Sequence, residues 1–149
     1  MNPNMKLYEE LQVLAAIGPS AQAVGTLNSG WVLVDEVESF LAAIQTGVLG
    51  AAATLDAKLQ QATSAAGAGA KDVTGKALTQ IVKATGDNVQ AFIHCRGDEL
   101  DVTNGFCYVQ LSMTVAAAAS QTAALLYGGH PRNYPASDKN PASVVQLVG

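Results

Sequence analysis

The feature that most constrains the fold of this chain is an alternation of apolar and polar residues with a period of two. The alternation is clearest over residues 106–115, directly after the turn-forming dipeptide Asn104-Gly105. The apolar set of this segment occupies the odd positions: Cys107, Val109, Leu111, Met113 and Val115. Because successive side chains of a strand point to opposite faces, the pattern predicts a strand with one buried side and one polar or partner-facing side.

Further strand candidates with turn residues between them follow along the chain. They are residues 31–37, 39–49, 53–61, 76–82, 88–95, 120–127 and 143–148. Segments 88–95 and 106–115 are expected to form a hairpin with a long charged connection. Residues 63–71, rich in small side chains, and residues 128–142, rich in Pro, Gly, Asn and Asp, are predicted to be irregular.

The N-terminal segment 7–17 carries two overlapping patterns. Leu7, Leu11 and Leu14 are spaced as on a helix, whereas Leu7, Leu11 and Ile17 share odd positions with other apolar residues, as on a strand. We favour the strand and leave the helix open. The chain is then an all-β single domain over residues 1–149, a β-sandwich or jelly roll of about eight or nine short strands with extended terminal arms.

The composition narrows the class of protein. Charged residues make up 13% of the chain, against about 25% in ordinary soluble domains. The resulting weakly polar surface suits a subunit whose faces pack against neighbours in an assembly. The net charge of −4 and the lack of any Lys/Arg block exclude a nucleic-acid-binding stripe and a polybasic membrane patch.

The sequence also predicts neither a membrane span nor a signal peptide. No run of 18 apolar residues is present, so no membrane span is predicted. Glu9 and Glu10 interrupt what would be the apolar region of a signal peptide, so we expect synthesis and folding in a cytoplasm.

Few side chains are suited to catalysis. His94 and Cys95 are neighbours in a predicted strand and therefore face opposite sides. A meeting of His94 with Cys107 across the expected hairpin stays open, although we interpret His94 as a residue of an outer strand face. His130 is interpreted as a loop anchor or an interface contact. Both cysteines are interpreted as reduced strand residues, with a cross-strand disulfide as the alternative.

The carboxylates and aromatic residues give no clear site either. Asp98, Glu99 and Asp101 lack the spacing of a calcium loop, so we interpret them as a solvated turn, with a surface cation in an assembly as the alternative. Most aromatic residues lie in predicted strands and are assigned to the core; Trp31, just after a turn, is the exception. We predict a non-enzymatic protein without catalytic residues, cofactor or metal.

Two segments carry a resemblance to a known group. Residues 105–115, Gly-Phe-Cys-Tyr-Val-Gln-Leu-Ser-Met-Thr-Val, precede an alanine-rich run and then residues 124–132, Ala-Leu-Leu-Tyr-Gly-Gly-His-Pro-Arg. The pattern resembles that of small structural proteins from tailed-bacteriophage head gene clusters. Segments 7–11, 53–63, 70–79 and 98–101 fit the same pattern, so the resemblance covers nearly the whole chain. The departure is Gly129-His130, where a single spacer residue is expected.

The resemblance implies a structural virion protein that decorates and stabilises a tailed-phage capsid, a cement or decoration protein on the capsid exterior, made in the bacterial host cytoplasm. It implies the major capsid protein as partner and a homo-oligomer, with a trimer favoured. Another virion component, such as a neck, tail or head-fibre subunit, is the first alternative. A glycan-binding module that uses Trp31 is the second. We place the candidate capsid or subunit contacts in the terminal arms: Lys6, Leu7, Tyr8, His130, Pro131, Arg132 and Tyr134.

Overall fold

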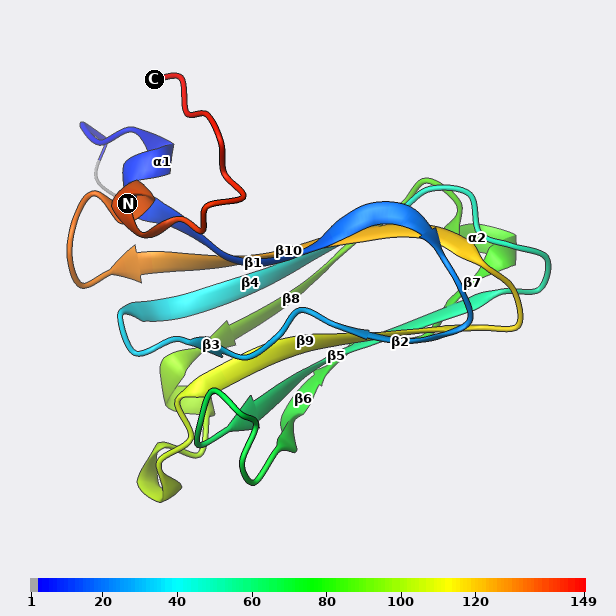
Figure 1. Ribbon diagram of the computed structural model, residues 1–149, viewed down its shortest axis with the longest axis horizontal. Coiled ribbons are helices and arrows are strands. Elements are labelled where there is room, and N and C mark those ends of the chain that lie inside the picture. The colour runs from blue at the N-terminus through cyan, green and yellow to red at the C-terminus, as the bar shows by residue number, and fades with distance from the viewer. Residues whose placement is uncertain (1–2) are drawn as a thin grey trace.

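The computed structural model describes residues 3–149, which form two antiparallel sheets packed face to face (Figure 1). Sheet A holds, in spatial order, β1 (Leu11–Gln22), β10 (Ser120–Pro131), β4 (Val37–Thr46) and β8 (Gln90–Arg96). Sheet B holds β2 (Gly25–Asn28), β9 (Tyr108–Ala116), β5 (Thr54–Ala62) and β6 (Lys71–Ala77). The short strands β3 (Val32–Leu33) and β7 (Ile81–Val82) pair with β9 and β5.

The helical elements are single turns at the ends and connections. They are α1 (Leu7–Glu10), α2 (Lys83–Gly86), η1 (Gly97–Glu99), η2 (Val102–Asn104) and η3 (Ala136–Lys139). None of the helices between residues 3 and 149 has the length and apolar character needed to cross a membrane.

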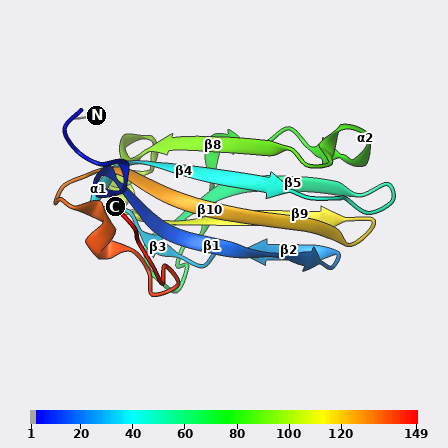
Figure 2. The same cartoon turned by 90° about the horizontal axis from the view of Figure 1, so that it is seen from above.

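The core fills the space between the two sheets, whose strands run in near alignment (Figure 2). Phe40 and Ile44 from β4 face Leu59 and Leu111 from sheet B, and all four are almost fully buried. Burying each such side chain contributes about 1.5–3 kcal/mol. The predicted all-β sandwich is therefore confirmed.

The alternation in the sequence correctly assigned the buried side of the central strands. In β5, Leu55, Ala57 and Leu59 face the core. In β9 the predicted apolar set is buried, but Gln110 on the other side is buried too. Strand β9 lies between β2 and β5, and Gln110 Nε2 donates to Gln60 Oε1 at 2.9 Å, so neighbouring polar side chains cover it.

The expected hairpin of residues 88–95 and 106–115 is wrong. Strand β8 pairs with β4 at the edge of sheet A, whereas β9 lies inside sheet B. The connection through η1 and η2 passes from one sheet to the other. A connection of this length does not impose the register of a tight hairpin, and each strand pairs with an apolar strand of its own sheet instead.

Several predicted boundaries are also corrected. Residues 143–148 form no strand and pair with none of the described strands. Segment 31–37 shortens to β3, β4 ends at Thr46, and segment 76–82 divides into the end of β6 and β7. Segment 7–17 combines the two patterns that the sequence left open: one helical turn, α1, followed by β1.

The predicted irregular segment 128–142 begins later than expected, because β10 continues through Gly128 and Gly129 to Pro131. Strand β10 is paired on both sides, with β1 and with β4. A Cβ at Gly128 would lie 2.7 Å from Cγ1 of Val37, so a glycine is needed here by close packing rather than by a turn.

Candidate functional site

The two terminal segments meet at one end of the sandwich (Figure 1). There they expose large apolar side chains, which we call the terminal cluster: Leu7, Tyr134, Val145, Leu147 and Val148. Val145 is 91% exposed and Val148 is 83% exposed. Apolar side chains gathered in this way on a soluble surface are typical of a docking site.

Hydrogen bonds hold the C-terminal segment against β1 rather than leaving it free. Gln12 Nε2 donates to the carbonyl of Lys139 at 3.1 Å, and the backbone N–H of Val13 donates to Asn140 Oδ1 at 2.8 Å. Lys139 also forms an ion pair with Glu36. The last residue, Gly149, lies so close to Tyr8 that a Cβ there would be 2.5 Å from Tyr8 Oη. The start of the C-terminal segment is thus fixed on β1, and its end lies beside Tyr8.

The structure divides the predicted contact residues between this cluster and a neighbouring hollow. Lys6 and Leu7 are exposed, and Lys6 Nζ lies 5.6 Å from the ring centre of the half-buried Tyr8. Tyr134 is exposed in the turn before η3, whereas Pro131 is buried as the last residue of β10. His130 and Arg132 are exposed and line the hollow at the same end of the sandwich.

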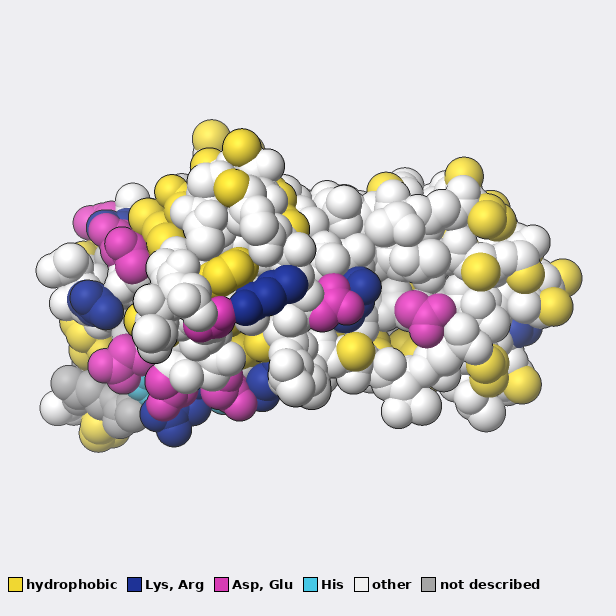
Figure 3. Space-filling view, turned by 90° about the horizontal axis from the view of Figure 1, so that it is seen from below, with side chains coloured by type: hydrophobic (Ala, Val, Ile, Leu, Met, Phe, Trp, Pro, Cys, Tyr) yellow, Lys and Arg dark blue, Asp and Glu magenta, His cyan; other side chains and the backbone are white. Residues whose placement is uncertain are grey.

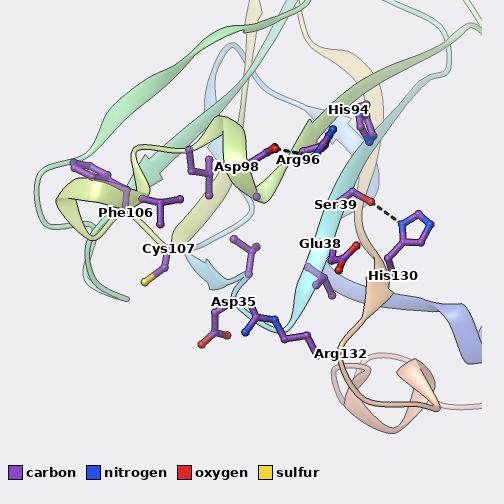
Figure 4. Close-up of a pocket in the computed structure, with 15 residues that line it drawn as sticks. Asp35, Glu38, Ser39, His94, Arg96, Asp98, Phe106, Cys107, His130 and Arg132 are labelled. Carbon is purple, nitrogen blue, oxygen red and sulfur yellow. Dashed lines mark hydrogen bonds and ion pairs between the residues drawn. The ribbon is translucent and has the colours of Figure 1, made fainter.

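This hollow has a volume of about 690 Å³ and opens between the start of β4 and the connection that follows β8 (Figure 4). Ser39 Oγ lies 3.2 Å from Nδ1 of His130, and Arg96 Nη2 donates to Asp98 Oδ2 at 2.7 Å. Asp35, Glu38 and Arg132 line it as well. Because acids and bases mix in its walls, the hollow has no single charge that would select an anion or a cation.

The arrangement of nucleophiles and bases gives no catalytic unit among the described residues. In Figure 4, Cys107 lies on one side of the hollow, and His94 and His130 lie on the other. The predicted alternative of a His94–Cys107 pair across a hairpin is wrong, because their strands belong to different sheets. The Ser39–His130 pair has no carboxylate bonded to the imidazole among its described contacts, so nothing orients the ring as in a triad.

The two cysteines are both free, so the alternative of a cross-strand disulfide is wrong. Cys95 is buried in the core of sheet A. Burial raises the pKa of the Cys95 thiol to about 12, and the nearby charge of Glu99 adds to the effect. The thiol therefore stays protonated at neutral pH and is a poor nucleophile.

The carboxylates 98, 99 and 101 lie in the turns of η1 and η2, each next to a cation. Glu99 Oε1 lies 2.8 Å from Nζ of Lys76, while Asp101 pairs with Lys71. These ammonium groups hold the pKa values of Glu99 and Asp101 below their ordinary range. Glu99 and Asp101 thus tie the connection to β6, whereas Asp98 pairs with Arg96 at the end of β8. Within residues 3–149, no three His, Cys, Asp or Glu side chains are grouped to hold a metal ion.

The outer faces of the two sheets differ in chemistry. The outer face of sheet B is polar: Lys58 pairs with Asp72 at 2.9 Å, and Thr26 and Thr114 share a hydrogen bond of 2.9 Å. Figure 3 shows the molecule from this side, with side chains of both charges along its middle.

The centre of the outer face of sheet A is apolar, and we call this part face A. Polar side chains border it on β4 and β8: Gln45, Gln90, His94 and Arg96. The outward side chains of face A align across the four strands: Val13, Ala16, Leu41, Ala43, Phe92, Ala123, Leu125 and Tyr127. Phe92 is 64% exposed and Leu125 is 37% exposed. Alanines form the floor of a shallow hollow of about 460 Å³ on this face, which Phe92, Leu125 and Tyr127 help to line.

The assignment of aromatic residues to the core is wrong for Phe92. The signal was present in the sequence, because Ile93 and Cys95 face the core and Phe92 occupies the opposite parity on the same strand. Trp31 is half-buried, and its Nε1 packs so closely on Gly67 that a Cβ there would lie 2.4 Å away. Trp31 is therefore a packing residue beside the loop 63–70 rather than an open platform.

Comparisons with known proteins find similar solved structures only at low scores. No family model matches the chain, and no curated protein matches it. A CBM4 structure has 13% identity and a TM-score of 0.41, covering 67% of this chain and 56% of its own. The CBM22-1 xylan-binding domain of Paenibacillus barcinonensis Xyn10C has 13% identity and a TM-score of 0.41, covering 82% of this chain and 90% of its own.

A viral structure has a comparable score. The infectious bursal disease virus VP2 subviral particle has 14% identity and a TM-score of 0.41, covering 85% of this chain and 32% of its own. The chain thus spans about a third of that viral protein and just over half of the CBM4 chain. TM-scores this low describe a likeness in the arrangement of strands and do not assign a function.

Proposed function

We propose that this protein is a structural subunit of a tailed-phage virion that decorates the exterior of the capsid and stabilises it by binding the major capsid protein. The terminal cluster is the observation that carries the proposal. Five large apolar side chains are exposed at one end of the sandwich, and the C-terminal segment that carries three of them is hydrogen bonded to β1 at residues 139 and 140.

A clamp of this kind works by burying apolar surface on neighbouring capsid subunits. At about 25 cal/mol per Å², a valine side chain that becomes fully buried contributes about 1.5 kcal/mol. Val145 and Val148 are almost fully exposed in the free chain, so nearly all of this gain remains available for docking. Many copies on one shell add these modest contributions together.

The low content of charged residues supports the same function. Charged residues make up 13% of the chain, and most of the ion pairs lie on sheet B or at the connections. The Lys139–Glu36 ion pair and Lys6 flank the terminal cluster, so a contact there must keep these charges at its wet edge to avoid the desolvation cost of buried ions.

The first experiment is quantitative mass spectrometry of purified virions, comparing this protein with the major capsid protein. We expect copies on the order of hundreds per particle, as on a symmetric shell. About six to twelve copies, the number of a symmetric ring, would replace decoration with a neck or tail position. Absence from the particle would refute a virion role.

The contact itself is tested with the double variant Val145→Ser/Val148→Ser. Loss of two valine contacts of about 1.5 kcal/mol each weakens shell binding by about 100-fold. The matched control is Val24→Ser/Val48→Ser, which changes two exposed valines in the connections at the other end of the sandwich. Equal occupancy of capsids by both variants would rule out the terminal cluster as the contact.

A further inference from the structure

We propose that face A binds face A of a second copy, in a two-fold pair in which Phe92 of each chain enters the alanine-floored hollow of the other. The inference rests on the proposed function only where it places the pair on a capsid shell. The pairing itself is expected of the isolated protein in solution.

The first argument is the chemistry of the uncovered face. Across β8, β4, β10 and β1, one row reads Phe92, Ala43, Leu125 and Ala16. The next row reads His94, Leu41, Tyr127 and Val13. These rows hold no Asp, Glu, Lys or Arg. The chain has a net charge of −4, yet two copies that meet at these rows bring no carboxylates together. The row beyond His94 carries Arg96, which is paired with Asp98.

The second argument is shape. Ala16, Ala43 and Ala123 leave the middle of face A low, whereas Phe92 projects from the edge strand β8. A two-fold interface uses the same patch on both chains. If Phe92 of one chain enters the hollow of the second, Phe92 of the second chain therefore enters the hollow of the first. A projecting phenyl ring and a hollow beside it satisfy this requirement within one face.

The third argument is area. Four strands about 4.8 Å apart, over the ten residues of β4 at about 3.3 Å each, outline roughly 600 Å² for the whole outer side of sheet A. This area includes the rows on either side of face A, which carry Gln45 with Gln90 and Ser39 with Arg96. Stable interfaces bury about 800 Å² per partner, with a range that reaches down to about 600 Å². A pair of this size therefore uses face A as its apolar centre and the flanking polar rows as its rim, and two sheets can stack about 10 Å apart, as they do inside the sandwich.

A sugar chain fits face A less well than a second copy. Sugar sites combine an aromatic platform with hydrogen-bonding groups that fix orientation. Gln45 and Gln90 line one edge of the hollow and His94 flanks Phe92, but the floor is alanine, so a sugar lying on it would find hydrogen-bonding groups along that edge only. The two-fold pair also differs from the trimer that the phage resemblance favours, and a measured mass separates the two.

The test is the mass of the purified protein in solution, by sedimentation velocity and native mass spectrometry over a range of concentrations. We expect a species of twice 15.3 kDa for the natural sequence. Phe92→Glu and Leu125→Glu place charges in the contact and should raise the dissociation constant of the pair at least 100-fold. Val102→Glu, an exposed valine in η2 outside face A, should leave the pair intact.

Phe92 is mostly exposed in the single chain, so Phe92→Glu should keep its circular dichroism spectrum and its melting transition when measured as a monomer. A monomer at all concentrations, a trimer, or a pair unaffected by Phe92→Glu would overturn the inference. So would a monomer that binds polysaccharide through Phe92. A monomer present in many copies on virions would refute the pairing alone, whereas a pair absent from virions would refute the phage function alone.

Discussion

Two adjacent leucines of β10 offer a direct test of the register of sheet A. Leu126 faces the core and is 1% exposed, whereas Leu125 faces outward on face A and is 37% exposed. A slip of one residue in a strand would exchange these two environments. The variants Leu126→Ala and Leu125→Ala therefore remove the same atoms from opposite sides of one strand.

The expected costs differ because only one variant leaves a cavity. Leu126 packs within the core cluster, and truncation of a fully buried leucine costs about 2–5 kcal/mol, so we take about 3 kcal/mol. Leu125 touches its strand neighbours but has water on one side, and we expect a cost below about 1 kcal/mol in the monomer. The matched pair cancels differences in side-chain chemistry and strand propensity.

The assay is urea unfolding followed by circular dichroism and by Trp31 fluorescence, at concentrations where the chain is a monomer. With a slope of about 2 kcal/mol per molar urea, a loss of 3 kcal/mol lowers the midpoint by about 1.5 M. Equal losses in the two variants would show that face A is covered. A larger loss for Leu125→Ala would show that the register is reversed, and either result would refute the reasoning.

Three further predictions follow from individual contacts. Burial raises the pKa of Cys95 to about 12, so only Cys107 should react with a thiol reagent in the native state at neutral pH, and two equally reactive thiols would contradict this. The Lys71 ammonium lowers the pKa of Asp101, so its contribution to stability is complete above the unfolded pKa of about 3.9 and is lost as the pH falls through the lower folded value. Unfolding free energies between pH 6 and pH 2 should therefore converge for the natural sequence and Asp101→Asn, and a constant difference would count against the ion pair. Gly128→Ala should cost about 1–3 kcal/mol because its Cβ would meet Val37, whereas Gly18→Ala, with nothing within 4 Å, should melt as the natural sequence does.

The sequence was most informative where a strand has one buried side. In β5 and β9, alternation places Leu55, Leu59 and Leu111 correctly in the core. Alternation carries no information about which strands pair, so β8 and β9 were assigned to one hairpin although they belong to different sheets. Pairing depends on contacts between residues far apart in the chain, which a local period cannot reveal.

The candidate site was predictable in part for the same reason. The sequence predicts Leu7 and Tyr134 as contacts, and the structure shows only that both are exposed. Val145 and Val148 were assigned to a strand, because a local apolar pattern looks the same whether or not a strand edge is present beside it. Face A was missed because its outward positions become one surface only when four strands stand in register.

The difference between the two outer faces constrains how a pair could sit on a shell. Docking through sheet B would strip water from the Lys58–Asp72 pair, at a cost that Coulomb attraction between buried ions often fails to offset. Docking through face A removes no such charges. For both terminal clusters of a pair to reach one shell, the two-fold axis must run along the strands, because an axis across the strands would send the clusters to opposite ends. A pair with its axis along the strands binds the shell at two points at once, so that the second contact forms at a high effective concentration.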